Sequence, residues 1–372
     1  MNLSSLGARA SIDRSGAIPV VVVDAQTGKA SAPQPAATGA GIAIPLPDPA
    51  MASRLARRME AVEVALSSAV TQADRLADDV SRHLLAAGGK RLRPFLTLLT
   101  GELGDGTRPE LIDAAVIVEL THLATLYHDD VMDSAPLRRG VPSAHTVWGN
   151  SVAILTGDLL FARASQLVAG LGSEAVLSQA HTFERLCLGQ LHETMGPGSG
   201  EDPVAHYLGV LADKTASLLA TAARLGAMYS GAPTEFVEVV ARYGEQVGVA
   251  FQLADDVIDL TGSGAETGKT PGTDLRENVP TMPVLLLRQR LARGEASPSD
   301  QALLAAIDGD LTDDAVLANV VARLRAHDVL VETRELATRY ARDAEATLSP
   351  LPEGPVKAAL ASFATALADR AR

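Results

Sequence analysis

Two acidic clusters of the same form place the strongest constraint on how this chain can fold. Residues 129–133 (DDVMD) and 255–259 (DDVID) share the pattern D-D-x-x-D, and each lies in an apolar, helix-forming stretch. On a helix, residues i and i+4 share a face, so Asp129 lies beside Asp133 and Asp255 beside Asp259. Like charges at this spacing weaken a helix. The pattern therefore predicts two helices whose carboxylates are compensated by a cation.

Magnesium is the cation that this arrangement favours. It binds through one or two carboxylates and completes its shell with water and substrate phosphates. Two carboxylate walls that face each other across a cavity could hold several ions, and those ions could hold a diphosphate. For either cluster alone, a helix cap or a solvated surface run is the competing interpretation. The predicted metal-binding residues are Asp129, Asp130, Asp133, Asp255, Asp256 and Asp259.

Composition limits the classes of protein that fit. The chain has 372 residues, of which 47% are hydrophobic, enough for a sizeable core, and only 3% are aromatic. Abundant Ala and Leu favour helix over strand. The single cysteine, Cys187, excludes an intrachain disulfide framework and a Cys-based zinc site and fits a reducing compartment. A net charge of -13 argues against nucleic-acid binding, so an anionic substrate would need metals and a local basic patch.

From residue 51 onward the apolar spacing is helical almost throughout. Helices are expected over 111–133 and near 150–172, 174–195, 205–230 and 233–261, with a Gly-, Thr- and Pro-rich loop over 262–280. We find no convincing strand alternation and no repeat of fixed period. The prediction is a single all-α domain, residues 51–372, with its helices bundled around a deep central apolar cavity.

The ends and the apolar stretches add two further expectations. Residues 1–50 are rich in Ala, Gly, Pro and Ser and are expected to form a low-complexity, disordered extension. Every strongly apolar stretch is expected to be interrupted by charged or polar residues well before about 18 residues, so no transmembrane segment is predicted. The N-terminus also lacks the long apolar segment of a secretory signal.

Basic residues cluster in two motifs. Residues 88–94 (GGKRLRP) place three cations within four residues just before a helix. The glycines let the backbone approach a ligand, and Lys and Arg can clamp phosphate oxygens. A positive helix start is disfavoured by the macrodipole, which favours a functional role. Arg138 and Arg139 follow the first acidic cluster, where a surface salt-bridge network is the competing interpretation. Single residues such as His122, Lys214, Gln252 and Lys269 are weak signals alone.

These motifs together resemble the trans-isoprenyl diphosphate synthases of the polyprenyl synthetase family. The resemblance runs from about residue 51 to the C-terminus. It rests on the segments GGKRLRP (88–94), HDDVMDSAPLRRG (128–140), GD (157–158), KTA (214–216), FQLADDVID (251–259) and GKTPGTDL (268–275). One departure is Asn278, which stands where the family pattern leads us to expect glycine.

The resemblance implies a role for each residue. Asp129 and Asp133 would bind two magnesium ions, and Asp255 would bind a third with support from Asp256 and Asp259. The residues implied for isopentenyl diphosphate are Lys90, Arg93, His122 and Arg139. Those implied for the allylic diphosphate are Arg138, Lys214, Thr215, Gln252 and Lys269, with Lys214, Gln252 and Lys269 assigned catalytic roles. The family usually forms homodimers, and peripheral membrane contact for product release is compatible with a cytoplasmic enzyme.

The implied reaction makes a carbocation from the allylic primer, which the double bond of isopentenyl diphosphate attacks. Product length depends on a tunnel beside the helix that carries Asp129. In the family, bulky aromatics four and five positions upstream close this tunnel. Here those positions are Thr125 and Ala124, which are small, and Tyr127 faces elsewhere. The expected product is a longer all-trans polyprenyl diphosphate of the kind used as a quinone side chain, and geranylgeranyl diphosphate is the nearest alternative.

Two other classes fit less well. A terpene cyclase would carry an Asn/Ser/Glu-type second metal motif and would lack GGKRLRP. A non-catalytic subunit of a heteromeric synthase should have lost one aspartate motif or the Lys90 and Arg93 pair, and this chain keeps both. A purely structural helical protein would leave six clustered Asp in apolar sequence unexplained.

Overall fold

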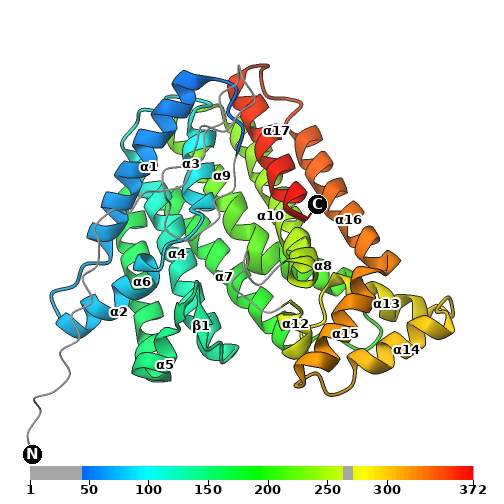
Figure 1. Cartoon of the computed structure of the whole chain (residues 1–372). Coiled ribbons are helices and arrows are strands. Elements are labelled where there is room, and N and C mark those ends of the chain that lie inside the picture. The colour runs from blue at the N-terminus through cyan, green and yellow to red at the C-terminus, as the bar shows by residue number, and fades with distance from the viewer. Residues whose placement is uncertain (1–43, 263–270, 372) are drawn as a thin grey trace, which may run out of the picture.

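The computed structural model describes residues 44–262 and 271–371, and this part of the chain is almost entirely helical (Figure 1). The first half contains α1 (Pro49–Ala69), α2 (Arg75–Ala86), α3 (Leu92–Gly101), α4 (Glu110–Met132), α5 (Ala144–Trp148), α6 (Asn150–Leu171) and α7 (Ser173–Met195). The second half contains α8 (Pro203–Leu211), α9 (Ser217–Tyr229), α10 (Thr234–Thr261), α12 (Thr273–Arg276), α13 (Met282–Ala292), α14 (Pro298–Ile307), α15 (Asp314–Arg325), α16 (Asp328–Thr347) and α17 (Pro355–Ala368). The all-α prediction is confirmed.

Two long helices organise the bundle. α4 packs against α1, α3, α6 and α9, while α10 packs against α9, α16 and α17 (Figure 1). Most residues of α4 are buried around its whole circumference, which is why its sequence is apolar without a clear polar face. α9 lies between the two helices and contacts both, so the largest core cluster is shared by the elements on either side of it. The two acidic clusters are carried by these two central helices.

Helix boundaries follow local chemistry. Asp48 caps α1 by accepting a hydrogen bond from the Ala50 N–H, and Pro49 occupies the first turn. Ser297 and Asp300 form a reciprocal capping box at the start of α14. The predicted long helices agree with the observed α4, α6, α7 and α10 to within a residue or two. Such caps and the apolar periodicity are local signals, and for this reason they could be seen in the sequence.

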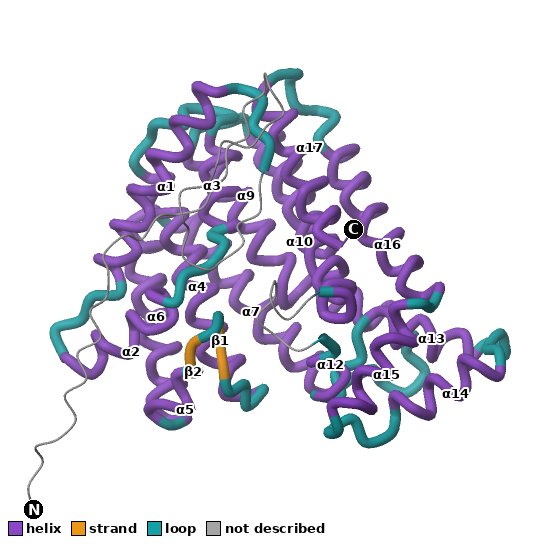
Figure 2. Tube along the Cα trace, viewed as in Figure 1, coloured by secondary structure: helices purple, strands orange, loops and turns teal. Residues whose placement is uncertain are grey.

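Three features differ from the sequence analysis. Ile44 and Leu46 are buried in the main core, so ordered packing begins before residue 51. A two-stranded hairpin, β1 (Leu137–Arg138) with β2 (Val141–Pro142), follows α4 (Figure 2). The short helix α12 lies within the segment expected to be a loop. The hairpin strands are only two residues long, too short for an alternation pattern to reveal them.

The expectation about apolar stretches also needs correction. Among the described residues, α4 and α6 are long and apolar enough to cross a membrane by length and composition. Two thirds of the apolar window of α4 are buried inside the bundle, as expected for a core helix. Only one third of the window of α6 is buried, so this helix presents an apolar face that the other described residues do not cover.

Candidate functional site

Both acidic clusters lie at the C-terminal ends of their helices. Asp133 is the C-cap residue of α4, and α10 ends at Thr261, two residues after Asp259. The C-terminal end of a helix carries partial negative charge, which aspartates increase and cations relieve. This placement strengthens the requirement for a compensating cation that the sequence indicated.

Within each cluster the second aspartate turns into the protein. Asp130 is 1% exposed, and its Oδ1 accepts a hydrogen bond from Arg138 Nε at 2.6 Å. Asp256 is also 1% exposed, and it accepts hydrogen bonds from the Tyr207 hydroxyl at 2.9 Å and the Met282 N–H at 3.2 Å. Burial raises the pKa of Asp256 well above its ordinary value. Both carboxylates, which the sequence predicted as metal ligands, are thus buried and bonded to neighbouring elements, while Asp130 Oδ2 has no hydrogen-bond partner.

The outer aspartates have different surroundings. Burial raises the pKa of Asp129 to about 6; Lys214 opposes this rise and the neighbouring Asp133 adds to it. Asp255 Oδ1 lies 3.0 Å from Arg370 Nη1, an ion pair that does not meet hydrogen-bond geometry, and the Arg370 guanidinium lies 4.8 Å from the centre of the Phe251 ring. Asp259, also on α10, has partners as well.

The aspartate oxygens suit a hard cation, but the described residues form no preassembled set of three or more ligands. Among residues 44–262 and 271–371, no group of three or more His, Cys, Asp or Glu side chains is close enough to hold a metal ion. Magnesium needs only one or two carboxylates when phosphates and water complete its shell. The donor set therefore fits magnesium held jointly with a phosphorylated ligand better than a tightly chelated structural ion.

Three cations have no carboxylate partner among the described residues: Lys90 is exposed, and Arg93 and Arg139 are half-buried. Within the described part of the chain, Lys90, Arg93 and Arg139 take part in no ion pair, and Arg93 Nε has no hydrogen-bond partner. Burial lowers the pKa of Lys90 and of Arg93, and it lowers that of Arg139 to about 10. The half-buried Arg93 and Arg139 act on each other as like charges, and an anion would relieve this repulsion.

His122 belongs to the same group. Burial, together with the positive charges of Arg93 and Arg139, holds the pKa of its imidazole well below the ordinary value. His122 is therefore neutral at pH 7 and can donate one hydrogen bond to an anion without adding charge. Of the four residues predicted for isopentenyl diphosphate, Arg93 of α3, His122 of α4 and Arg139 of the hairpin thus lie within electrostatic reach of one another. The charges that act on Lys90 are those of Arg370 and Asp255.

Lys214 and Thr215 lie in a π-helical turn, Ala212–Ala216, between α8 and α9. Such turns interrupt α-helices frequently at functional sites. Lys214 Nζ pairs with Glu193 on α7, and Thr215 Oγ1 donates to Gln252 Oε1 on α10 at 3.3 Å. Burial acts to lower the pKa of Lys214, but the attraction of Glu193 and Asp129 outweighs it and the pKa is raised. Lys214 therefore stays charged beside the first cluster.

Glycines bring the flanking helices close to this turn. A Cβ on Gly189 of α7 would lie 2.6 Å from the Lys214 backbone nitrogen, and one on Gly248 of α10 would lie 2.4 Å from Ala216 Cα. One helical turn beyond each glycine stand Glu193 and Gln252, which contact Lys214 and Thr215 respectively. Glu193 was not predicted from the sequence; its place one helical turn after Gly189 on α7 is what brings it to Lys214.

Electrostatic contacts join these groups into one site. The charge of Asp255 acts on Lys90, which links the start of α3 to the end of α10. Asp129 acts on Lys214, which links α4 to the π-helical turn. Lys269 lies outside the described residues. Asn278 adopts a left-handed backbone with φ of 57°, a conformation that asparagine tolerates better than other non-glycine residues, so its replacement of glycine preserves the turn.

The two positions expected to control product length, Ala124 and Thr125, differ in burial. Ala124 is fully buried, and its carbonyl lies 3.1 Å from where a Cβ on Gly157 of α6 would be. Thr125 is only partly buried, and its hydroxyl donates to the His122 carbonyl at 2.8 Å. The Tyr127 hydroxyl bonds to the backbone of α2, at the Val80 carbonyl and the Leu84 N–H, so Tyr127 faces elsewhere as expected.

Comparisons with known proteins point in the same direction. The family profile described as polyprenyl synthetase matches residues 74–324. The chain is 43% identical to the nonaprenyl diphosphate synthase of Mycobacterium tuberculosis over 88% of this chain and 96% of that protein. It is 36% identical to heptaprenyl diphosphate synthase component 2 of Geobacillus stearothermophilus, covering 86% of this chain and 98% of that protein.

A solved structure matches as well. The geranylgeranyl pyrophosphate synthase of Corynebacterium glutamicum, complexed with calcium and isoprenyl diphosphate, superposes with a TM-score of 0.77 at 41% sequence identity. The match covers 87% of this chain and 98% of that one.

Proposed function

Because this chain belongs to the polyprenyl synthetase family, we propose that it is a magnesium-dependent prenyltransferase that condenses isopentenyl diphosphate with an allylic diphosphate. The observation that supports this most is a set of three cations close to two aspartate clusters, the half-buried Arg93 and Arg139 and the exposed Lys90, which take part in no ion pair within the described part of the chain. A diphosphate would supply the missing negative charge, and magnesium would relieve the aspartates.

The metal assignment follows from the two orientations within each cluster. Asp129, Asp133, Asp255 and Asp259 would hold magnesium, and three ions would be shared with the diphosphate. Magnesium supplies charge neutralisation for the leaving diphosphate. Asp130 and Asp256 would support the site from behind, through Arg138 and through Tyr207 and Met282.

The two substrates would use different cations. Lys90, Arg93, His122 and Arg139 would bind isopentenyl diphosphate, and the neutral His122 would donate a hydrogen bond. Arg138, Lys214, Thr215, Gln252 and Lys269 would bind the allylic diphosphate and stabilise the charge that develops on it.

The reaction needs no side-chain nucleophile. The allylic C–O bond breaks, the diphosphate leaves with the bonding electrons, and an allylic cation remains. The double bond of isopentenyl diphosphate then forms the new C–C bond, and a proton passes to the departed diphosphate. Lys214, held charged by Glu193 and Asp129, would stabilise the leaving oxygen atoms, and exclusion of water protects the cation from hydrolysis.

We propose a long-chain all-trans product, of the kind used as a quinone side chain, because small side chains stand upstream of Asp129. Thr125 is the partly exposed position, so Thr125→Phe should shorten the products more than Ala124→Phe, whose site is fully buried. Geranylgeranyl diphosphate is the alternative product, and the names of the relatives include both lengths. Chromatography of the wild-type products decides between the two chain lengths, and chromatography of each variant's products tests the tunnel assignment. Products of the same length from both variants would reject the tunnel assignment.

We also propose that the chain forms a homodimer through α6 and α7. Exposed apolar side chains gather on these helices: Ile154, Leu155, Val176, Leu177, Phe183, Leu188, Leu191 and Met195. Light scattering of purified protein should give twice the chain mass. Leu155→Asp with Leu191→Asp should give monomers, whereas Val64→Asp, at an exposed apolar position of α1, should not. A different subunit on this face is the alternative, because one relative is named as a component.

One experiment tests the activity. Purified protein is incubated with isopentenyl diphosphate, a series of allylic primers and magnesium, and the products are separated by chromatography. Magnesium-dependent chain elongation is expected in a cytoplasmic enzyme that releases its apolar product at a membrane surface. Absence of elongation with every primer would contradict the proposal.

A further inference from the structure

The three cations of residues 88–94 do not share one task. Lys90 and Arg93 have no ion-pair partner in the described part of the chain, but the Arg91 guanidinium is completely engaged. Nε and Nη2 bond to the Glu63 carboxylate at 2.6 and 3.4 Å, and Nη1 bonds to Glu119 Oε1 at 3.0 Å. The remaining donors reach the carbonyls of Gly88 and Leu85. All five donors are satisfied, so Arg91 has none left for a substrate.

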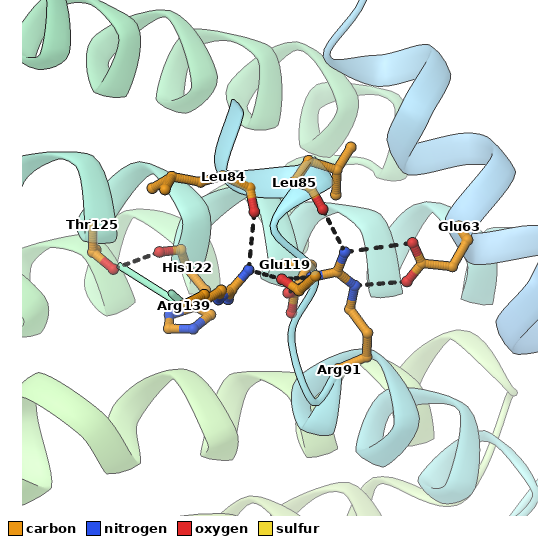
Figure 3. Close-up of polar contacts among 9 residues, drawn as sticks. Glu63, Leu84, Leu85, Arg91, Glu119, His122, Thr125 and Arg139 are labelled. Atoms are coloured by element: carbon orange, nitrogen blue, oxygen red, sulfur yellow. Dashed lines mark hydrogen bonds and ion pairs between the residues drawn. The ribbon is translucent and has the colours of Figure 1, made fainter. Parts of the chain in front are cut away.

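This bonding holds an unfavourable backbone in place. Arg91 has φ of 49°, in the left-handed region that a bulky non-glycine residue rarely adopts, and it stands at the N-terminus of α3 without a side-chain cap. Such a conformation persists only where its surroundings determine it. Figure 3 shows the Arg91 guanidinium between Glu63 of α1 and Glu119 of α4. Two carboxylates from different helices therefore fix the turn that sets the directions of Lys90 and Arg93.

Glu119 also lies close to the other cations of the anion site. It is 2% exposed, it stands one helical turn before His122, and its charge acts on Arg93 and Arg139 as well as on Arg91. Arg139 in turn donates to the carbonyl of Leu84, in the last turn of α2 (Figure 3), and to that of Gly88, in the loop that follows. One buried carboxylate thus partly balances three arginines while leaving net positive charge for a ligand.

The loop that contains Gly89 is tightly packed against the side chains of Arg91 and Arg139. A Cβ on Gly89 would lie 2.8 Å from Arg91 Nη1 and 2.9 Å from Arg139 Cζ. The two guanidinium groups pack directly on the backbone of Gly89. A shift of the Arg91 side chain would consequently move both the loop and Arg139.

We propose that Glu119 and Glu63, acting through Arg91, are positioning residues for the isopentenyl diphosphate site. They touch no substrate, but they set the geometry of Lys90, Arg93 and Arg139 around one diphosphate. This inference rests on the proposed function, because it assumes that these cations bind isopentenyl diphosphate. It assigns the middle cation of the motif, which the sequence analysis had grouped with the phosphate clamp, to the scaffold.

The test compares Glu119→Gln, Glu63→Gln and Arg91→Lys with wild type in steady-state kinetics, with each substrate varied separately. Misplaced binding groups should raise the KM for isopentenyl diphosphate by on the order of tenfold to a hundredfold. The KM for the allylic primer should stay within about twofold, because Lys214, Thr215 and Gln252 are held by other helices. Glu63→Gln should have the smaller effect, since Glu63 is partly exposed and Glu119 is buried.

Glu102→Gln is the matched control. It removes an ion pair between the same two helices, Arg54 of α1 with Glu102 at the far end of α3, at 2.6 Å. It should lower thermal stability without changing either KM. Glu63→Gln retains Glu119 and serves if Glu119→Gln does not fold.

The possible outcomes separate the two proposals. Equal rises in both KM values, or changes that follow only the loss of thermal stability, would overturn the positioning role. Unchanged KM values in both folded glutamine variants would do the same. If wild type itself shows no binding of isopentenyl diphosphate by calorimetry, the proposed function fails, and the inference fails with it.

Discussion

The two aspartate clusters have the same sequence pattern and different supports. In the first, the buried Asp130 is held by a cation, Arg138, which belongs to the hairpin that also carries Arg139. In the second, the buried Asp256 is held by neutral donors, the Tyr207 hydroxyl and the Met282 N–H. The first cluster is therefore linked to charged ligand-binding groups, whereas the second ties α10 to α8 and α13.

The residues four positions upstream differ in the same way. Thr125 precedes Asp129, and Phe251 precedes Asp255 beneath the Arg370 guanidinium. The first cluster thus has a small side chain one turn upstream, whereas the second has an aromatic ring in contact with an arginine. Two copies of one motif can therefore present the same outer carboxylates while different residues hold the buried aspartate in place.

The largest expected effect concerns what the clusters share. Asp129→Asn and Asp255→Asn should each lower kcat by on the order of a thousandfold, because each removes charge that would stabilise metal and leaving group. Asp79→Asn, on the exposed side of α2, is the control and should leave kcat unchanged. Loss of activity in only one of the two variants would show that the clusters are not functionally equivalent.

The first cluster should also give the metal-free protein a distinctive pH dependence. The pKa of Asp129 is about 6 in the folded protein and 3.8 in its ordinary state. Between these values the folded state keeps a proton that the unfolded chain has released, so the free energy of unfolding falls as pH rises and is level above about pH 6. The expected loss is on the order of 3 kcal/mol.

Urea unfolding between about pH 4 and pH 6, with a chelator present to keep the protein free of metal, measures how the free energy of unfolding depends on pH. Asp129→Asn should flatten the curve, whereas Asp79→Asn should keep the wild-type slope. A wild-type slope in Asp129→Asn would place the titrating group elsewhere.

The same Asp→Asn substitution should lower the free energy of unfolding by different amounts at the two buried aspartates, Asp130 and Asp256. Asp130→Asn leaves the Arg138 guanidinium without its carboxylate and should lower the free energy of unfolding by about 2 kcal/mol. Asp256→Asn should cost about 1 kcal/mol or less, because burial already favours the neutral form of Asp256 and a carboxamide can keep its hydrogen bonds. Both are measured by urea unfolding at pH 7. Equal losses of unfolding free energy in the two variants would mean that the charge of the partner, Arg138 or the neutral donors of Tyr207 and Met282, does not decide the cost.

The smallest expected effect involves Arg370. In the absence of metal, Arg370 neutralises Asp255, so magnesium must compete with it for the carboxylate. Arg370→Ala should strengthen the apparent magnesium affinity by up to about fivefold, the scale of one partly exposed ion pair. Magnesium titrations of activity provide the measurement. Weaker magnesium binding in this variant would indicate instead that Arg370 contributes to holding substrate.

Local signals account for what could be read without the fold. The helices over 111–133 and 233–261 were visible because apolar spacing and Pro or Gly boundaries act within a few residues. The hairpin after α4 and the buried contacts of Ile44 and Leu46 were not visible, because short segments carry little pattern. The π-helical turn at Lys214 was also hidden, since it depends on the close approach of Gly189 and Gly248.

The sequence by itself determined an all-helical chain, the identity of the acidic and basic motifs, and the outer pairs of aspartates on shared helix faces, because these follow from spacing along one helix. Only the tertiary structure decided that Asp130 and Asp256 turn inward, that Arg91 serves Glu63 and Glu119 rather than a ligand, and that Glu193 joins Lys214. The physical reason is that a charged side chain takes whichever partner the packing of distant helices brings within reach, and no local spacing encodes that choice.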